Sequence, residues 1–62
     1  MIKYTRDEMF IMRRALEALQ EKDRKLITIA EHLDDPRGVE IFNEEIEKAN
    51  EMINRLNEEI RG

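Results

Sequence analysis

A seven-residue repeat runs through residues 39–60, VEIFNEEIEKANEMINRLNEEI. Its apolar residues alternate three and four positions apart, which places them on one stripe of an α-helix, as in a coiled coil. These residues are Val39, Phe42, Ile46, Ala49, Ile53, Leu56 and Ile60. The repeat predicts a long amphipathic helix in the second half of the chain.

A second stripe with the same spacing precedes the first. It consists of Met9, Met12, Leu16, Leu19, Asp23, Leu26, Ala30 and Leu33. Residues 20–25, QEKDRK, are all polar and could instead form a loop between two shorter helices. They contain no glycine or proline, and Glu21 precedes Lys25 by four positions, which is the favourable order for a helical ion pair. We therefore predict one continuous helix.

Capping residues mark the predicted helix boundaries. Thr5 and Glu8 have the spacing of a capping box, in which each side chain accepts a hydrogen bond from the other residue's backbone N–H. Asp35 is a favoured N-cap and Pro36 a favoured first helical residue, and the proline pushes Asp35 out of helical geometry. We expect one helix over about 6–33, a turn within 34–37 and a second helix over about 36–61.

The short turn makes the two helices antiparallel neighbours, so the fold class is an all-α two-helix hairpin in a single domain, residues 1–62. In this register the large Phe42 lies opposite the small Ala30, as dense packing requires. The expected pairs across the seam are Leu33 with Val39, Ala30 with Phe42, Leu26 with Ile46, Asp23 with Ala49, Leu19 with Ile53, Leu16 with Leu56, and Met12 with Ile60.

The two flanks of this seam differ in polarity. Apart from Ile27, one flank is polar, with Arg13, Gln20, Asn43, Asn50 and Asn57. The other, which we call the apolar flank, consists of Ile11, Ala15, Ala18, Ile29, Ile41 and Met52. This apolar arc is wider than one neighbouring helix can cover, and a lone hairpin exposing it would be marginally stable. We expect a two-fold homodimer that forms a four-helix bundle through these residues, with a higher oligomer, a different protein partner or a monomer as the alternatives.

Composition narrows the class of protein. The chain has no cysteine, 42% charged residues and 5% aromatic residues, which together with the repeats indicates a helical protein. Residues 1–33 hold seven Lys/Arg and six Asp/Glu, whereas residues 34–62 hold four and nine, so the second helix is acidic. No apolar run is long enough to span a membrane, and residues 1–8 lack the apolar core of a signal peptide. We expect a cytoplasmic protein with no membrane contact.

Residues that could carry chemistry are few. His32, Asp34 and Asp35 are conceivable metal ligands, but a histidine at a helix C-terminus beside two aspartates has a simpler electrostatic explanation. Asp23 in the seam is better explained as a polar layer that sets register, with Arg24, Lys22 or Asn50 as its partner. No nucleophile–base arrangement or phosphate-binding loop occurs. We therefore expect no enzymatic activity, no cofactor, no metal and no small-molecule substrate.

Phe10 is an aromatic residue that lies off the apolar stripe. Helical spacing places it near a line of polar residues that could form a ligand face: Arg6, Arg13, Arg14, Gln20 and Arg24. An exposed aromatic ring among arginines can stack on a base or bind an acidic partner. Alternatively, Phe10 covers the end of the bundle together with Ile2 and Tyr4.

In length and plan the chain is similar to the Rop family of plasmid-copy regulators, two-helix hairpins that dimerise into a four-helix bundle and clasp paired RNA loops. Phe10 with Arg6, Arg13 and Gln20 resembles that family's exposed-aromatic face. The resemblance implies an RNA-binding regulator, whereas Glu17 within the stripe and the net charge of −4 count against RNA binding. The leading interpretation is a small adaptor, inhibitor or accessory protein. The alternatives are an RNA-binding regulator and a designed hairpin or an excerpt of a larger scaffold.

Overall fold

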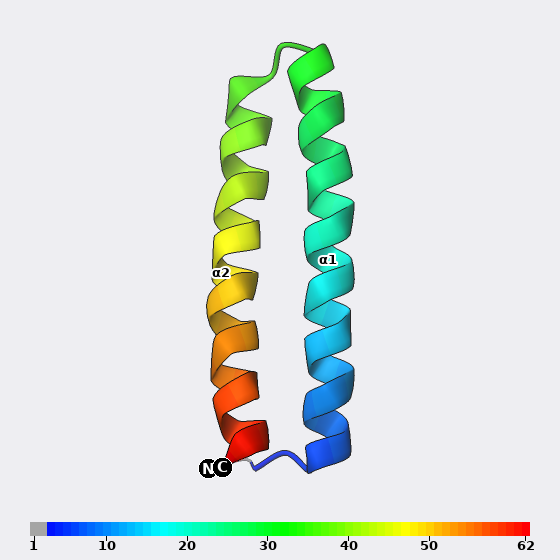
Figure 1. Ribbon diagram of the computed structural model, residues 1–62. Coiled ribbons are helices and arrows are strands. Elements are labelled where there is room, and N and C mark those ends of the chain that lie inside the picture. Colours follow the sequence, from blue (N-terminus) through cyan, green and yellow to red (C-terminus); the bar gives the residue numbers. More distant parts are fainter. Residues whose placement is uncertain (1–2) are drawn as a thin grey trace.

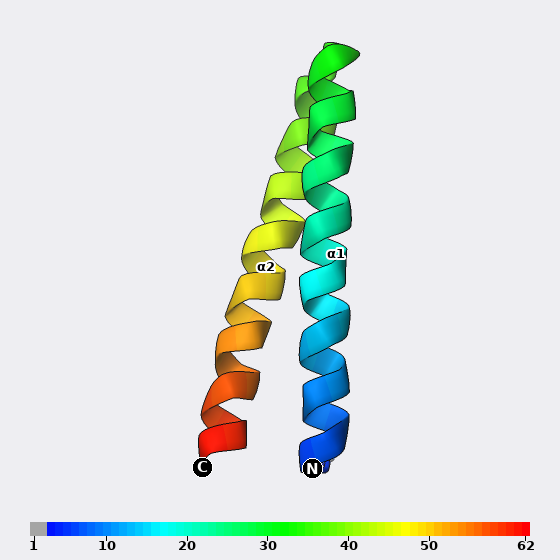
Figure 2. The same ribbon diagram turned by 45° about the vertical axis from the view of Figure 1, so that its right-hand side comes forward.

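The computed structural model describes residues 3–62, which form two helices, α1 (Arg6–His32) and α2 (Pro36–Arg61). The helices lie side by side and antiparallel, with the turn at one end and both termini at the other (Figure 1). Turning the molecule shows α2 inclined to α1, as in a coiled coil (Figure 2). The rod measures 43 × 18 × 16 Å. The predicted all-α hairpin is confirmed.

The start of α1 is held by the predicted capping box. The Thr5 hydroxyl accepts a hydrogen bond from the Glu8 N–H at 3.1 Å, and Glu8 Oε1 accepts one from the Thr5 N–H at 2.7 Å. These bonds favour the ionised carboxylate, so the pKa of Glu8 lies below its ordinary value. Glu8 thus satisfies a free backbone donor and places negative charge at the positive end of the helix.

α1 remains helical through residues 20–25, so the predicted continuous helix is confirmed. Glu21 and Lys25 approach to 4.0 Å, with both side chains mostly exposed to solvent. Because exposed ion pairs of this kind contribute little, the helix is maintained here by backbone hydrogen bonding and by packing of the seam.

The turn contains the largest departure from the expected seam. α1 ends at His32, Leu33 is the C-cap, and Asp34 has a left-handed backbone with φ 54°. Leu33 is 74% exposed, so its expected pairing with Val39 in the seam is wrong. The reason is that the chain leaves the helix at Leu33, and its side chain no longer follows the stripe. Asp35 then caps α2, because its Oδ1 accepts from the Gly38 N–H at 3.1 Å.

The remaining seam residues are buried or half-buried, as the two stripes predict. Ala30 and Ala49 are nevertheless the only apolar residues among the described ones that are fully buried. Every large apolar side chain keeps part of its surface in contact with solvent, since two helices cover only one side of each other. Neither α1 nor α2 has an apolar stretch long enough to cross a membrane.

Candidate interaction surface

The apolar flank lies on the surface, as expected. Its four large side chains are strongly exposed: Ile11 by 65%, Ile29 by 53%, Ile41 by 50% and Met52 by 46%. Ala15 and Ala18 are exposed between them. Scattered exposed apolar residues are normal, but these six share one side of a two-helix rod, which is typical of an interaction surface.

Tyr4 extends this surface and was not predicted to belong to it. Its ring is half exposed, and with Met12, Met52, Arg55 and Leu56 it lines an apolar hollow between the start of α1 and the end of α2. Tyr4 stands seven positions before Ile11, so the heptad spacing could have identified it even though it precedes the helix.

A polar layer interrupts the apolar flank near its middle. Lys22 stands seven positions from both Ala15 and Ile29 on α1, and Glu45 stands seven positions before Met52 on α2. Asp23 lies beneath them in the seam, with only 2% of its surface exposed. We call Lys22, Asp23 and Glu45 the polar layer. The flank is therefore divided into two apolar zones with charges between them.

Asp23 does not have the partners expected for it. Its Oδ2 atom has no hydrogen-bond donor among residues 3–62, and Asn50 is exposed to solvent. Its carboxylate instead lies close to that of Glu45. The pKa of Glu45 is raised because Asp23 hydrogen-bonds to its protonated form and repels its ionised form, while Lys22 opposes this shift weakly. When both acids are ionised, neither can donate to the other.

The polar flank is closed by direct contacts between the helices. Arg13 Nη1 donates to Asn57 Oδ1 at 2.7 Å, and Gln20 Nε2 donates to the Ile46 carbonyl at 3.0 Å. Gln20 is consequently buried, which corrects its expected place on an exposed ligand face. Both bonds satisfy polar groups within the hairpin.

The expected ligand face around Phe10 is partly occupied by the protein's own contacts. The Arg13 guanidinium lies over the half-buried Phe10 ring, 5.1 Å from its centroid, and its Nε is 3.7 Å from Glu17 Oε1. Arg6, Arg14 and Arg24 are exposed. Ile2, the other residue suggested to cover this end, lies outside the described residues. The face therefore consists of separate arginines beside a ring that is already covered.

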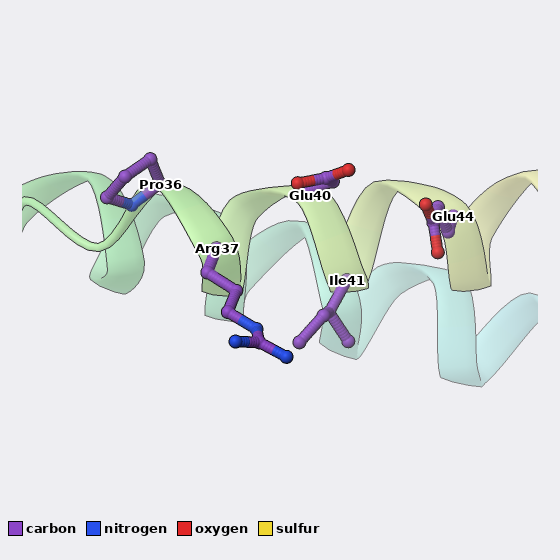
Figure 3. Close-up of a pocket in the computed structure, with 5 residues that line it drawn as sticks. All are labelled: Pro36, Arg37, Glu40, Ile41 and Glu44. Carbon is purple, nitrogen blue, oxygen red and sulfur yellow. The ribbon is translucent and has the colours of Figure 1, made fainter.

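A shallow hollow follows the first turns of α2 and is lined by Pro36, Arg37, Glu40, Ile41 and Glu44. Arg37 and Ile41 extend to one side of the helix and Pro36 to the other, so these side chains do not converge on an enclosed space (Figure 3). Nowhere in residues 3–62 do three or more potential metal ligands come together, His32 with Asp34 and Asp35 included.

The geometry thus places two apolar zones and one polar layer on a single side of the hairpin. Exposed apolar groups with charges in fixed positions between them are what helices present to other helices in a bundle. Comparison with family models, curated proteins and solved structures finds no match for this chain.

Proposed function

We propose that this protein is a non-enzymatic protein–protein interaction module whose working form is a homodimeric four-helix bundle. One observation carries the proposal. Only two alanines are fully buried among the apolar residues of the described chain, whereas Ile11, Ile29, Ile41 and Met52 remain about half exposed or more. A chain this short gains little stability from such a seam alone.

Burial of the apolar flank against another surface is energetically favourable. Complete burial of a large aliphatic side chain is worth about 1.5–3 kcal/mol, so covering the exposed half of each contributes on the order of 1 kcal/mol. The half-buried seam residues next to the flank would lose solvent contact at the same time. Pairing therefore supplies apolar burial that the isolated hairpin lacks.

A second copy of the chain is the occupant that the surface fits best. A two-fold interface uses the same residues twice, so every copy contributes the same exposed zones. The polar layer carries Lys22 and Glu45 side by side, and a surface with both signs of charge can complement itself. The assembled bundle would leave its outer faces free to contact a further protein, as an adaptor, inhibitor or accessory subunit does.

RNA binding through Phe10 has less support. Base stacking needs an accessible ring face, and Arg13 already covers the Phe10 ring while holding Asn57. We therefore place the interaction surface on the apolar flank.

Sedimentation velocity tests the proposal directly. We expect the protein to sediment as a dimer over about 5 to 500 µM, in a concentration-dependent equilibrium. The double variant Ile29→Glu, Ile41→Glu should sediment as a monomer, because it places charges in the apolar zone nearest the turn. The matched control is Asn43→Glu, Asn50→Glu, which alters two exposed residues of the polar flank and should remain dimeric. A wild-type protein that stays monomeric throughout would refute the proposal.

A further inference from the structure

The apolar flank shows the same order of zones on both helices. Starting at the turn, each helix presents an isoleucine, Ile29 on α1 and Ile41 on α2. The polar layer follows, with Lys22 on α1 and Glu45 on α2 close enough for the lysine to influence the pKa of the glutamate. Nearer the termini lies the second apolar zone, with Ile11, Ala15 and Ala18 on α1 and Met52 on α2. Because the helices are antiparallel (Figure 1), the order of the zones from the turn to the termini is the same on both.

Two hairpins can join their apolar flanks about a two-fold axis in two ways. With the axis parallel to the helices, both turns lie at the same end of the bundle, and α1 of each chain packs on α2 of the other. With the axis perpendicular to the helices, the turns lie at opposite ends, and α1 packs on α1. Both arrangements cover the apolar flank.

Apolar packing does not distinguish the two arrangements. With the turns together, Ile29 meets Ile41 of the partner subunit, and Met52 meets the small residue Ala15 or Ala18. With the turns apart and the polar layers aligned, Ile29 meets Ala15 of the partner subunit, and Ile41 meets Met52. Each arrangement therefore places apolar groups on apolar groups.

The charges of the polar layer do distinguish them. With the turns together, Lys22 faces Glu45 of the partner subunit, so positive and negative side chains alternate around the bundle. With the turns apart, Lys22 faces Lys22 and Glu45 faces Glu45, and like charges held face to face disfavour the complex. Lys25 and Lys48 stand seven positions from Ala18 and Ile41, so they also occupy positions on the flank, and both are exposed to solvent.

The buried acid in the seam favours the same arrangement. Asp23 Oδ2 has no donor within the described hairpin, and its carboxylate interacts with that of Glu45. With the turns together, a second lysine reaches this pair of carboxylates from the partner subunit. With the turns apart, a second glutamate approaches it instead. Only the first arrangement brings further positive charge to the two carboxylates.

We infer that two copies of this chain pair with their turns at the same end, and that the alternating charges of Lys22 and Glu45 determine this orientation. The inference rests on the proposed homodimer and adds to it the geometry of the interface. A single polar layer in an otherwise apolar interface commonly sets orientation in helical bundles.

Distances between spin labels test the orientation, because the chain has no cysteine and a single one can be introduced. A label at Arg37→Cys marks the turn end of the rod. The rod is 43 Å long and 18 × 16 Å across, so the inference predicts a separation on the scale of the width, plus the reach of the labels. Turns at opposite ends would give a separation on the scale of the length. The control label, at Glu21→Cys near the middle of α1, should give the shorter separation in both cases.

A second variant tests the role of the charges. Lys22→Gln, Glu45→Gln leaves the apolar flank intact and replaces the two charged groups that separate the orientations with neutral amides. With the turn label, this protein should remain dimeric and show both short and long separations. An unchanged single short separation would show that these charges do not determine the orientation.

The possible failures can be told apart. A dimer whose turn labels lie a rod length apart would overturn the orientation and leave the proposed function intact. A wild-type protein that remains monomeric in sedimentation would overturn both.

Discussion

Asp23 places a carboxylate in the middle of the seam, between Leu19 and Leu26 of the same stripe. It is 2% exposed, and one of its oxygens has no donor. Burial of such a group costs free energy that an apolar side chain would not, and the small Ala49 expected opposite it leaves room for a larger side chain. Asp23 therefore lowers the stability of the hairpin while it contributes a polar group to the seam.

We predict that Asp23→Leu raises the free energy of unfolding by about 1–3 kcal/mol, because it replaces an unpartnered buried carboxylate with an apolar group. Urea unfolding monitored by circular dichroism measures the change. Asp23→Asn is the control for shape, since it removes the charge at nearly constant volume, and its effect should be smaller. A lower urea midpoint for Asp23→Leu would mean that Asp23 has a stabilising partner.

The raised pKa of Glu45 predicts that the stability of the protein depends on pH. Its pKa in the folded protein lies above the ordinary 4.5, so the folded state takes up the proton more readily than the unfolded state does. The stability that this proton uptake gives the folded state is fully present below the ordinary pKa and is lost as the pH rises through the raised pKa. Glu45→Gln cannot titrate and should therefore gain stability relative to wild type as the pH rises from about 4 to 7.

The thermal midpoints of Glu45→Gln and of wild type, measured from about pH 4 to 7, test this prediction. The neighbouring Glu44→Gln is the matched control, because Glu44 is also exposed and lines the shallow hollow along the first turns of α2. A constant difference between Glu45→Gln and wild type at every pH would contradict the expected coupling to Asp23.

At the scale of the elements, the ends of the helices determine where each begins and stops. α1 starts with a reciprocal pair of hydrogen bonds between Thr5 and Glu8, and α2 starts with the single bond from the Gly38 N–H to Asp35. A Cβ at position 38 would lie 2.6 Å from Asp35 Oδ2, so glycine leaves room for this cap. Each helix cap involves residues only a few positions apart, so the two caps can be tested separately.

Thr5→Ala removes the hydroxyl that accepts from Glu8 N–H, and we predict a loss of about 1 kcal/mol in the free energy of unfolding. The control is Thr28→Ala, since the Thr28 hydroxyl donates to the Arg24 carbonyl at an exposed position inside α1 and its loss should have little effect. Chemical denaturation of the two variants gives the comparison. Equal losses would show that the capping box contributes nothing specific.

The backbone conformation of Asp34 in the turn leads to a second local prediction. Asp34 adopts a left-handed backbone that glycine enters without steric cost, so Asp34→Gly should stabilise the hairpin by about 0.5–1 kcal/mol. Asp35→Gly, at the adjacent cap, should have the opposite effect because it loses the bond to the Gly38 N–H. Thermal unfolding of both variants distinguishes backbone strain from capping, and a lower midpoint for Asp34→Gly would refute the expectation.

At the scale of the whole molecule, the hairpin is a thin rod with its apolar surface divided between a seam and an uncovered flank. A folded form stabilised by association becomes more stable at higher concentration, because unfolding requires dissociation. We predict that the thermal midpoint rises as the protein concentration increases from about 10 to 1,000 µM. In Ile29→Glu, Ile41→Glu the midpoint should be lower and independent of concentration, and a constant midpoint for the wild type would contradict association.

The two helices, their capping residues, the antiparallel hairpin and the division into a polar and an apolar flank could all be predicted from the sequence. These features follow from hydrophobic periodicity and from interactions within a few residues, which is why Thr5, Glu8 and the exposed isoleucines were found where the repeats placed them. The folded structure was needed to show which side chains meet across the seam: Glu45 with Asp23, Gln20 with the Ile46 carbonyl, and Arg13 with Asn57. It also decided that Leu33 leaves the seam. Such contacts depend on the relative height of two helices and on the reach of long side chains, and a repeat in the sequence constrains neither closely enough to pair individual atoms.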